Sequence, residues 1–106
     1  MDDPKTRYDA IADELVAENP EVQLGQMMGM PCIKVGGKMI MGIYEEEMVF
    51  KLPDEAVREQ ALALDGAHLF APGERGRAFK EWVQMPAAHM SDWPKYADEA
   101  IRLRAG

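Results

Sequence analysis

Apolar side chains recur with a helical period near the start of the chain. They occupy the i, i+3, i+4, i+7 and i+8 positions of one helical face, at Tyr8, Ile11, Ala12, Leu15 and Val16. Pro4 suits a first helical turn, and Asn19 with Pro20 forms a stop signal. The pattern predicts an amphipathic helix over about residues 4–18.

Residues 22–52 change to a period of two, which is typical of β-strands. Gly36 and Gly37 supply the positive φ angles of a two-residue hairpin, and a charged turn at residues 45–47 joins the last two runs. The pattern predicts a four-stranded antiparallel meander. Its strands are expected at residues 22–28, 32–35, 38–44 and 48–52.

Strict alternation also predicts which side chains of the meander share a face. Met39, Met41 and Ile43 are expected on one face of the third strand. The matching face of the fourth strand is expected to carry Met48, Phe50 and Leu52.

The residue pattern of the second half of the chain predicts a helix, a hairpin and a final helix. Asp54 is suited to cap a short helix that ends near Gly66. Residues 68–71 and 77–85 flank the turn-rich segment PGERG and form a second hairpin. The final helix is expected to be capped by Ser91 or Asp92. Its buried stripe is expected at Trp93, Tyr96, Ala97, Ala100 and Ile101.

Strands joined by hairpins, without alternating βα units, are typical of the α+β class. We expect a single antiparallel sheet of about six strands, made of the four-strand meander and the hairpin. Three helices should pack on one face, in the order α-ββββ-α-ββ-α. At 106 residues the chain is long enough for one domain over residues 1–106 with a modest core.

Composition limits the classes of function. The formal charge of −7 disfavours general nucleic-acid binding, because phosphate contacts depend on Lys and Arg. The acidic excess lies mainly in the first half, so an anion site is expected in the second. No run approaches the roughly 20 apolar residues of a membrane span. The single cysteine, Cys32, excludes an internal disulfide. We expect a cytoplasmic protein without membrane contact.

Few side chains suit catalysis or metal binding. Cys32 could be activated only by His68 or His89, and the structural role of a small buried thiol is favoured. The segment MMGMPC brings three methionines near Cys32, a set of soft ligands suited to Cu(I). Core packing is the favoured interpretation of the methionines too. We therefore expect no catalytic residue, no metal and no cofactor.

The second hairpin carries the strongest candidate site. Neither face of residues 77–85 is wholly apolar, because charged residues flank Phe79 on one face, while Lys80 and Gln84 flank Trp82 on the other. If the Phe79 face is buried, Glu81 is partly buried and pairs with Arg75 or Arg77, which leaves Trp82 exposed. Alternatively, Trp82 packs under the final helix. The candidate interaction surface comprises Arg75, Arg77, Lys80, Glu81 and Trp82.

Three segments carry a family resemblance: VGGKMIMGIYEEEMVFKL, GERGRAFKEWVQM and DWPKYADEA. Together they resemble the N-terminal domain of the TfoX family of bacterial competence regulators, which is related to YjbR-type domains. The resemblance runs from about residue 8 to residue 104. It implies an α+β fold in a bacterial cytoplasmic protein and no catalytic mechanism. It covers only the first half of those regulators, and MMGMPC replaces their usual glycine-rich turn.

The leading hypothesis is a non-enzymatic protein-interaction or regulatory module. Its partner would be another protein or a second copy of the chain, bound by the exposed sheet face or the basic hairpin. A DNA-associated transcriptional regulator is an alternative that uses Arg75, Arg77, Lys80, Arg102 and Arg104. A small-ligand binder or an enzyme with Glu81 as general base is the third.

Overall fold

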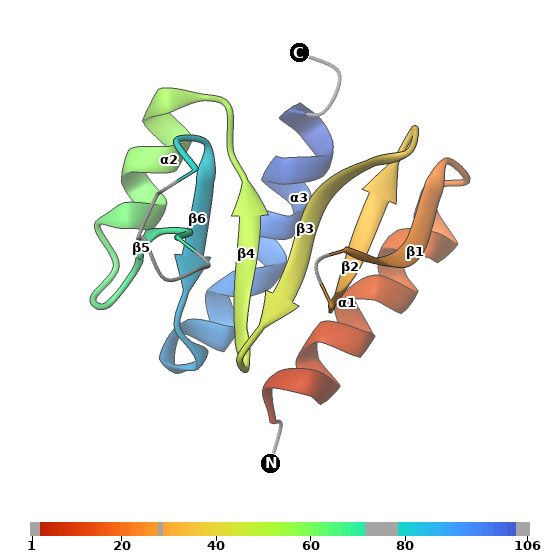
Figure 1. Cartoon of the computed structure of the whole chain (residues 1–106), viewed down its shortest axis with the longest axis horizontal. Coiled ribbons are helices and arrows are strands. Elements are labelled where there is room, and N and C mark those ends of the chain that lie inside the picture. The colour runs from red at the N-terminus through yellow and green to blue at the C-terminus, as the bar shows by residue number, and fades with distance from the viewer. Residues whose placement is uncertain (1–2, 28, 72–78, 104–106) are drawn as a thin grey trace.

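Helices and strands follow one another in the predicted order. The computed structural model describes residues 3–27, 29–71 and 79–103. Within these ranges lie α1 (Pro4–Glu18), β1 (Val22–Met27), β2 (Met30–Val35), β3 (Lys38–Tyr44), β4 (Glu47–Lys51), α2 (Glu55–Leu62), β5 (His68–Leu69), β6 (Trp82–Met85), the 3₁₀ helix η1 (Ala87–Asp92) and α3 (Trp93–Leu103) (Figure 1).

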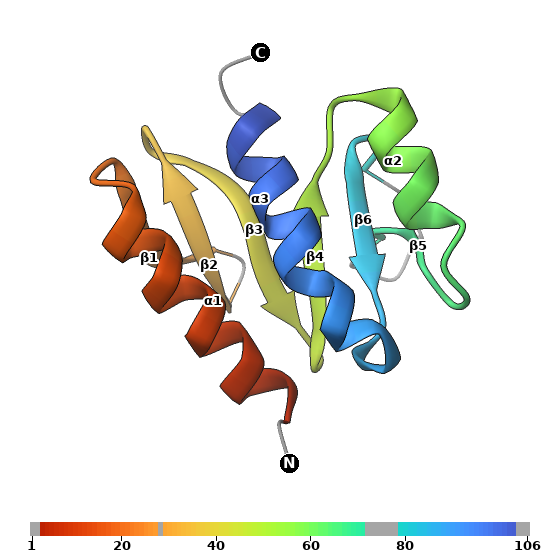
Figure 2. The ribbon, with the colours of Figure 1, turned by 180° about the vertical axis from the view of Figure 1, so that it is seen from behind.

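The six strands form a single antiparallel sheet with the order β1-β2-β3-β4-β6-β5. β1 to β4 make the meander, and β6 joins it at β4 with β5 on the outer edge. Figure 2 shows α1, α3 and α2 side by side in front of the sheet, so the three helices cover the same face. The opposite face, toward the viewer in Figure 1, carries none of them, and we call it the open face. The predicted α+β architecture is confirmed.

α1 begins and ends where its sequence signals predict. The Asp3 carboxylate accepts a hydrogen bond from the Thr6 backbone N–H at 2.7 Å and caps the first turn. At the other end, the Asn19 N–H donates to the Leu15 carbonyl at 2.9 Å. Four of the five predicted apolar positions are buried, whereas Val16 is 42% exposed at the margin of the stripe.

The main apolar core fills the space between the helices and the sheet. Phe50 on β4 is fully buried, and its ring centroid lies 6.3 Å from that of Tyr96 on α3. Met48, Phe50 and Leu52 all belong to this core, as alternation predicts. A shift of β4 by one residue would turn these side chains away from the helices, so the core fixes the strand register.

A β-bulge in β3 shows that one prediction about facing side chains is wrong. Ile33 and Lys34 are consecutive in β2, but their partners in β3 are Met41 and Met39. Ile40 therefore has no partner in β2 and is an extra residue in β3. The extra residue reverses the alternation, and Ile40 and Met41 both belong to the core under the helices. Met39 therefore lies on the open face. Strict alternation wrongly places it beside Met41 and Ile43.

The second hairpin is present but shorter than predicted. β5 and β6 pair antiparallel, which confirms the hairpin. β6 begins only at Trp82, because the Trp82 N–H donates to the Phe79 carbonyl at 3.1 Å in a turn. Phe79 and Glu81 therefore lie before the strand, and the alternating pattern of its two faces does not apply to them.

α3 begins without the predicted side-chain cap. The 3₁₀ helix η1 runs directly into it, and the Trp93 N–H donates to the Met90 carbonyl. Ser91 and Asp92 therefore lie within a continuous helical run, where the preceding turn supplies the acceptors that a cap would otherwise provide. Within the described ranges, no helix combines the length and the apolar character needed to cross a membrane.

The turn between β3 and β4 is strained. Glu45 and Glu46 have φ angles of 50° and 67°, in the left-handed region that side chains other than asparagine rarely adopt. The turn between β2 and β3 also has two residues with positive φ angles. It is not strained, because these residues are Gly36 and Gly37.

We expect Glu45→Asn combined with Glu46→Gly to raise the free energy of unfolding by about 1 kcal/mol, because Asn-Gly is the preferred pair for such turns. Urea unfolding measures the change. The matched control is Glu45→Gln with Glu46→Gln, which removes the same two charges and keeps the unfavourable backbone. An equal gain in both variants would show that charge repulsion, and not strain, is the source of the effect.

Candidate functional site

Small side chains cross the open face in one row. The strand register aligns Cys32 of β2 with Gly42 of β3, and Gly42 with Val49 of β4. Cys32 and Val49 are fully buried although they lie on the face without helices. They belong to a second apolar cluster, the open-face cluster, which consists of Met30, Cys32, Met39, Val49 and Phe70, with Tyr44 and Trp82 packed against it.

Gly42 is a point of close packing in the open-face cluster. A Cβ atom there would lie 2.7 Å from the Met30 Cε, 2.8 Å from the Pro31 carbonyl oxygen and 3.0 Å from the Met39 Cε. The two methionine methyl groups therefore fill the space above the glycine, where they serve as apolar packing. Among the described residues, no group of three His, Cys, Asp or Glu side chains is arranged to hold a metal.

A hollow of about 230 Å³ adjoins the open-face cluster. Two of the residues that line it come from distant strands. Met27 belongs to β1 and Trp82 to β6, and these strands are four places apart in the sheet. The sheet must therefore curl toward its open face to bring both side chains to one hollow, and the bulge in β3 favours such curvature. The lining is apolar: Met27, Met39, Phe70, Phe79 and Trp82.

Aromatic rings form much of the wall of the hollow. The Phe70 ring centroid lies 6.1 Å from that of Phe79 and 5.2 Å from that of Tyr44. Phe79 is 46% exposed and Met27 is 37% exposed, so large apolar side chains stand at the rim in contact with solvent. Exposed apolar groups around a concave site are typical of surfaces that bind another apolar group.

Two lysines are neighbours of residues that line the hollow, on a protein whose formal net charge is −7. Lys34 pairs with Met39 in the strand register, and its ammonium lies 3.3 Å from the position of a Cβ built on Gly25, so it extends along the open face. Lys80 follows Phe79 directly and is exposed. Neither lysine makes an ion pair with a described residue. The rim of the hollow therefore favours a group that carries negative charge.

The structure describes three of the five residues predicted to form one interaction surface, Lys80, Glu81 and Trp82, and of these Glu81 and Trp82 line different cavities. Trp82 lines the hollow and does not pack under α3, which covers the other face. Lys80 is exposed and directly follows Phe79, which lines this hollow. Glu81 is exposed, not partly buried, and lines a different cavity. Arg75 and Arg77 lie outside the described residues, and so does their predicted pairing with Glu81.

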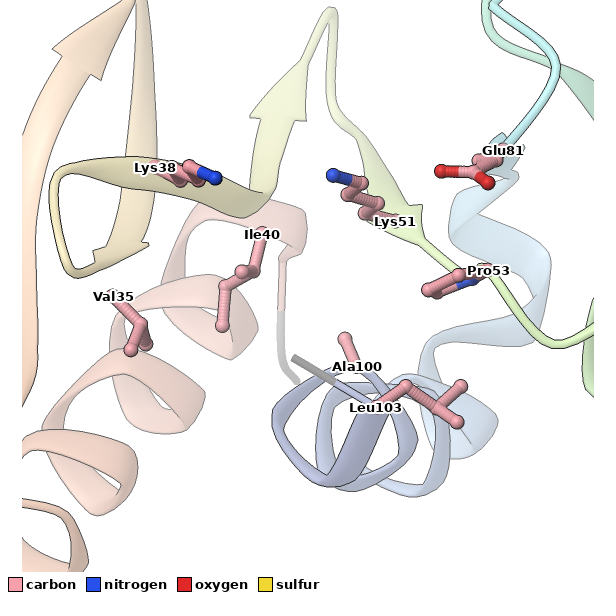
Figure 3. A pocket seen from close by; sticks show the side chains of 8 residues that line it. All are labelled: Val35, Lys38, Ile40, Lys51, Pro53, Glu81, Ala100 and Leu103. Atoms are coloured by element: carbon pink, nitrogen blue, oxygen red, sulfur yellow. The ribbon is translucent and has the colours of Figure 1, made fainter. Parts of the chain in front are cut away.

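A second cavity, of about 260 Å³, lies between the end of β4 and the last turn of α3, and we call it the lysine cavity. Figure 3 shows the ammonium groups of Lys38 and Lys51 pointing toward one another, with the Glu81 carboxylate facing the same space. None of these three groups makes a hydrogen bond or an ion pair with a described residue. The rest of the lining is apolar: Val35, Ile40, Pro53, Ala100 and Leu103.

Cys32 is not placed for nucleophilic catalysis. Burial raises the pKa of its thiol, and the nearby Lys34 ammonium offsets only part of that rise. His68 lies four strands away in the same row, about 19 Å along the sheet at the usual strand spacing. The His89 ring nitrogen Nε2 lies 2.8 Å from the Asp65 carbonyl oxygen. A buried thiol whose pKa is raised, and which makes no hydrogen bond to His68 or His89, lacks the activation that a nucleophile needs.

One of the basic residues predicted to contact DNA is already paired. The Arg102 guanidinium donates to both carboxylate oxygens of Glu99, at 3.0 Å and 2.9 Å. Arg75, Arg77 and Arg104 lie outside the described residues. Among the described residues of the predicted DNA-contacting set, only Lys80 therefore remains without an acidic partner.

Comparison with known proteins gives no match to this chain. This holds for models of known families, for curated proteins and for solved structures. The function must therefore be argued from the hollow, the lysine cavity and the charges around them.

Proposed function

We propose that this chain is a non-enzymatic interaction module that binds a protein partner through its open face. The hollow receives one apolar side chain of the partner, and Lys34 and Lys80 receive acidic residues on either side of it. The observation that carries this proposal is the hollow itself, where large apolar side chains line a solvent-open space on a face that none of the described helices covers.

Apolar burial supplies most of the affinity in this proposal. A partner Phe or Leu that leaves water on entering the hollow contributes about 1.5–3 kcal/mol. Trp82 belongs to the residue type most enriched among side chains that dominate binding energies. The lysines contribute mainly to selectivity and to the rate of association, because exposed charges guide an acidic segment to this part of an acidic surface.

We also propose that the chain is a TfoX N-terminal-like domain and acts as a regulator in the bacterial cytoplasm. The element order α-ββββ-α-ββ-α and the three sequence segments described above support this assignment. Regulation through a protein partner is favoured over direct DNA contact, because Arg102 is paired with Glu99 and the net charge is −7.

Selection of random peptides displayed on phage tests the proposed partner chemistry. We expect the chain to enrich peptides in which Phe, Leu or Trp stands beside Asp or Glu. Synthetic copies of these peptides should bind with an affinity that Phe79→Ser lowers by about tenfold or more, as measured by fluorescence anisotropy.

Val16→Ser is the matched control, because Val16 is an apolar side chain of similar exposure on α1, away from the open face. It should leave peptide binding unchanged. Enrichment of basic peptides, or an equal loss of binding in the two variants, would contradict the proposed site.

A further inference from the structure

The lysine cavity combines charges of both signs with an apolar wall. Lys38 is the first residue of β3, Lys51 is the last residue of β4, and Glu81 directly precedes β6. Their charged groups face one space in Figure 3. The fold therefore brings three charged groups to one space, and none of them makes an ion pair with a described residue.

The two lysines define an anion position. Two ammonium groups that point toward one another repel, and an anion between them removes that repulsion and accepts charge-assisted hydrogen bonds from both. A carboxylate has two oxygen atoms and can accept from both lysines at once.

Glu81 and α3 define a cation position in the same cavity. The Glu81 carboxylate can accept hydrogen bonds from an ammonium group. Leu103, the last residue of α3, lines the cavity, so the negative end of the helix dipole lies there and also favours a cation. A simple anion would leave Glu81 unpaired, whereas a ligand with both charges satisfies all three side chains.

The apolar wall and the volume define the rest of the ligand. Val35, Ile40, Ala100 and Leu103 present aliphatic surface from β2, β3 and α3. Pockets for drug-sized ligands occupy about 300–1,000 Å³. The cavity of about 260 Å³ is smaller and suits a smaller molecule.

We propose that the lysine cavity binds a free α-amino acid with an aliphatic side chain. Lys38 and Lys51 hold the carboxylate, Glu81 holds the ammonium, and the aliphatic side chain lies against Ile40 and Leu103. This site is separate from the hollow on the open face, and it does not depend on the protein partner proposed for that hollow.

Calorimetric titration of the full chain with three related molecules tests this site. The probes are leucine, isocaproate, which lacks the amino group, and isoamylamine, which lacks the carboxylate. We expect leucine to bind about tenfold or more tightly than either analogue, because each analogue leaves one set of charges unpaired. Absence of leucine binding, or equal binding of leucine and either analogue, overturns the proposal.

Substitutions assign the two charge positions. Lys38→Met and Lys51→Met should each weaken leucine binding by about tenfold. Glu81→Gln should remove the preference for leucine over isocaproate without weakening isocaproate. Lys5→Met is the matched control, because Lys5 pairs with Asp9 on α1 at 3.0 Å, and it should leave binding unchanged. If Lys5→Met weakens leucine binding as much as Lys51→Met does, the interaction is a general effect of charge and the site is refuted.

Discussion

Phe50→Ala is expected to lower the free energy of unfolding by about 3–5 kcal/mol. Phe50 is fully buried at the centre of the sheet, and its ring packs against Tyr96 of α3. Its truncation removes apolar contacts and leaves a cavity between the sheet and the helix that packs across it. Chemical denaturation followed by circular dichroism measures the loss.

Phe79→Ala is the matched control for this experiment. It makes the same chemical change in a ring that is 46% exposed at the rim of the hollow. Surface truncations usually change stability by less than about 1 kcal/mol. We expect Phe79→Ala to keep the fold and to lose peptide binding. Similar losses of stability in the two variants would contradict the assignment of Phe50 to the core and Phe79 to the binding surface.

Gly42→Ala is the second substitution with a large expected effect. The new methyl group would collide with the Met30 and Met39 methyl groups and with the Pro31 carbonyl oxygen. The methionine ends can move, but the carbonyl belongs to the backbone of β2 and can shift only if the strand pairing changes. We expect a loss of about 1–3 kcal/mol of unfolding free energy, the usual range for overpacking.

Gly25→Ala tests the same change at a second glycine of the sheet. The three atoms nearest to a Cβ at Gly25 all belong to the end of the Lys34 side chain, at 3.2 Å and beyond, and the end of a lysine side chain can move aside. Alanine also restricts the unfolded chain, so this variant should be neutral or more stable by about 0.5 kcal/mol. If Gly42→Ala is equally well tolerated, the open-face cluster is not packed as described.

The sequence predicts the fold because residues 22–52 follow the two-residue repeat of β-strands and are divided by turn-forming residues. Phe50 and its neighbours in β4 follow this rule without interruption. The rule fails at Ile40, because the extra residue of the bulge is itself apolar and leaves no visible break in the pattern. The face of the sheet on which Met39 lies is therefore set by the strand pairing and cannot be predicted from the local sequence.

The candidate sites are harder to predict, because their residues meet only after the sheet has curled. Met27 and Trp82 are far apart in the sequence and on different strands, yet they line one hollow. Lys38, Lys51 and Glu81 likewise come from three strand ends and share no motif. For Trp82 the sequence leaves two interpretations open, exposure to solvent or packing under the final helix. The structure shows neither, because Trp82 is half-buried against the open-face cluster, on the face opposite α3.

Proton–nitrogen correlation NMR tests the central claim most directly, with a peptide in which one phenylalanine stands between acidic residues. The chain has two tryptophans, Trp82 at the hollow and Trp93 of α3, which is fully buried in the core between the helices and the sheet, so their indole N–H signals report on the two faces of the sheet. We predict that the Trp82 indole signal and the backbone amides of Met27 and Met39 shift on titration, while the Trp93 indole signal stays in place. Shifts confined to α1, α2 and α3, or no shift at Trp82, would contradict the proposal that the open face is the binding surface.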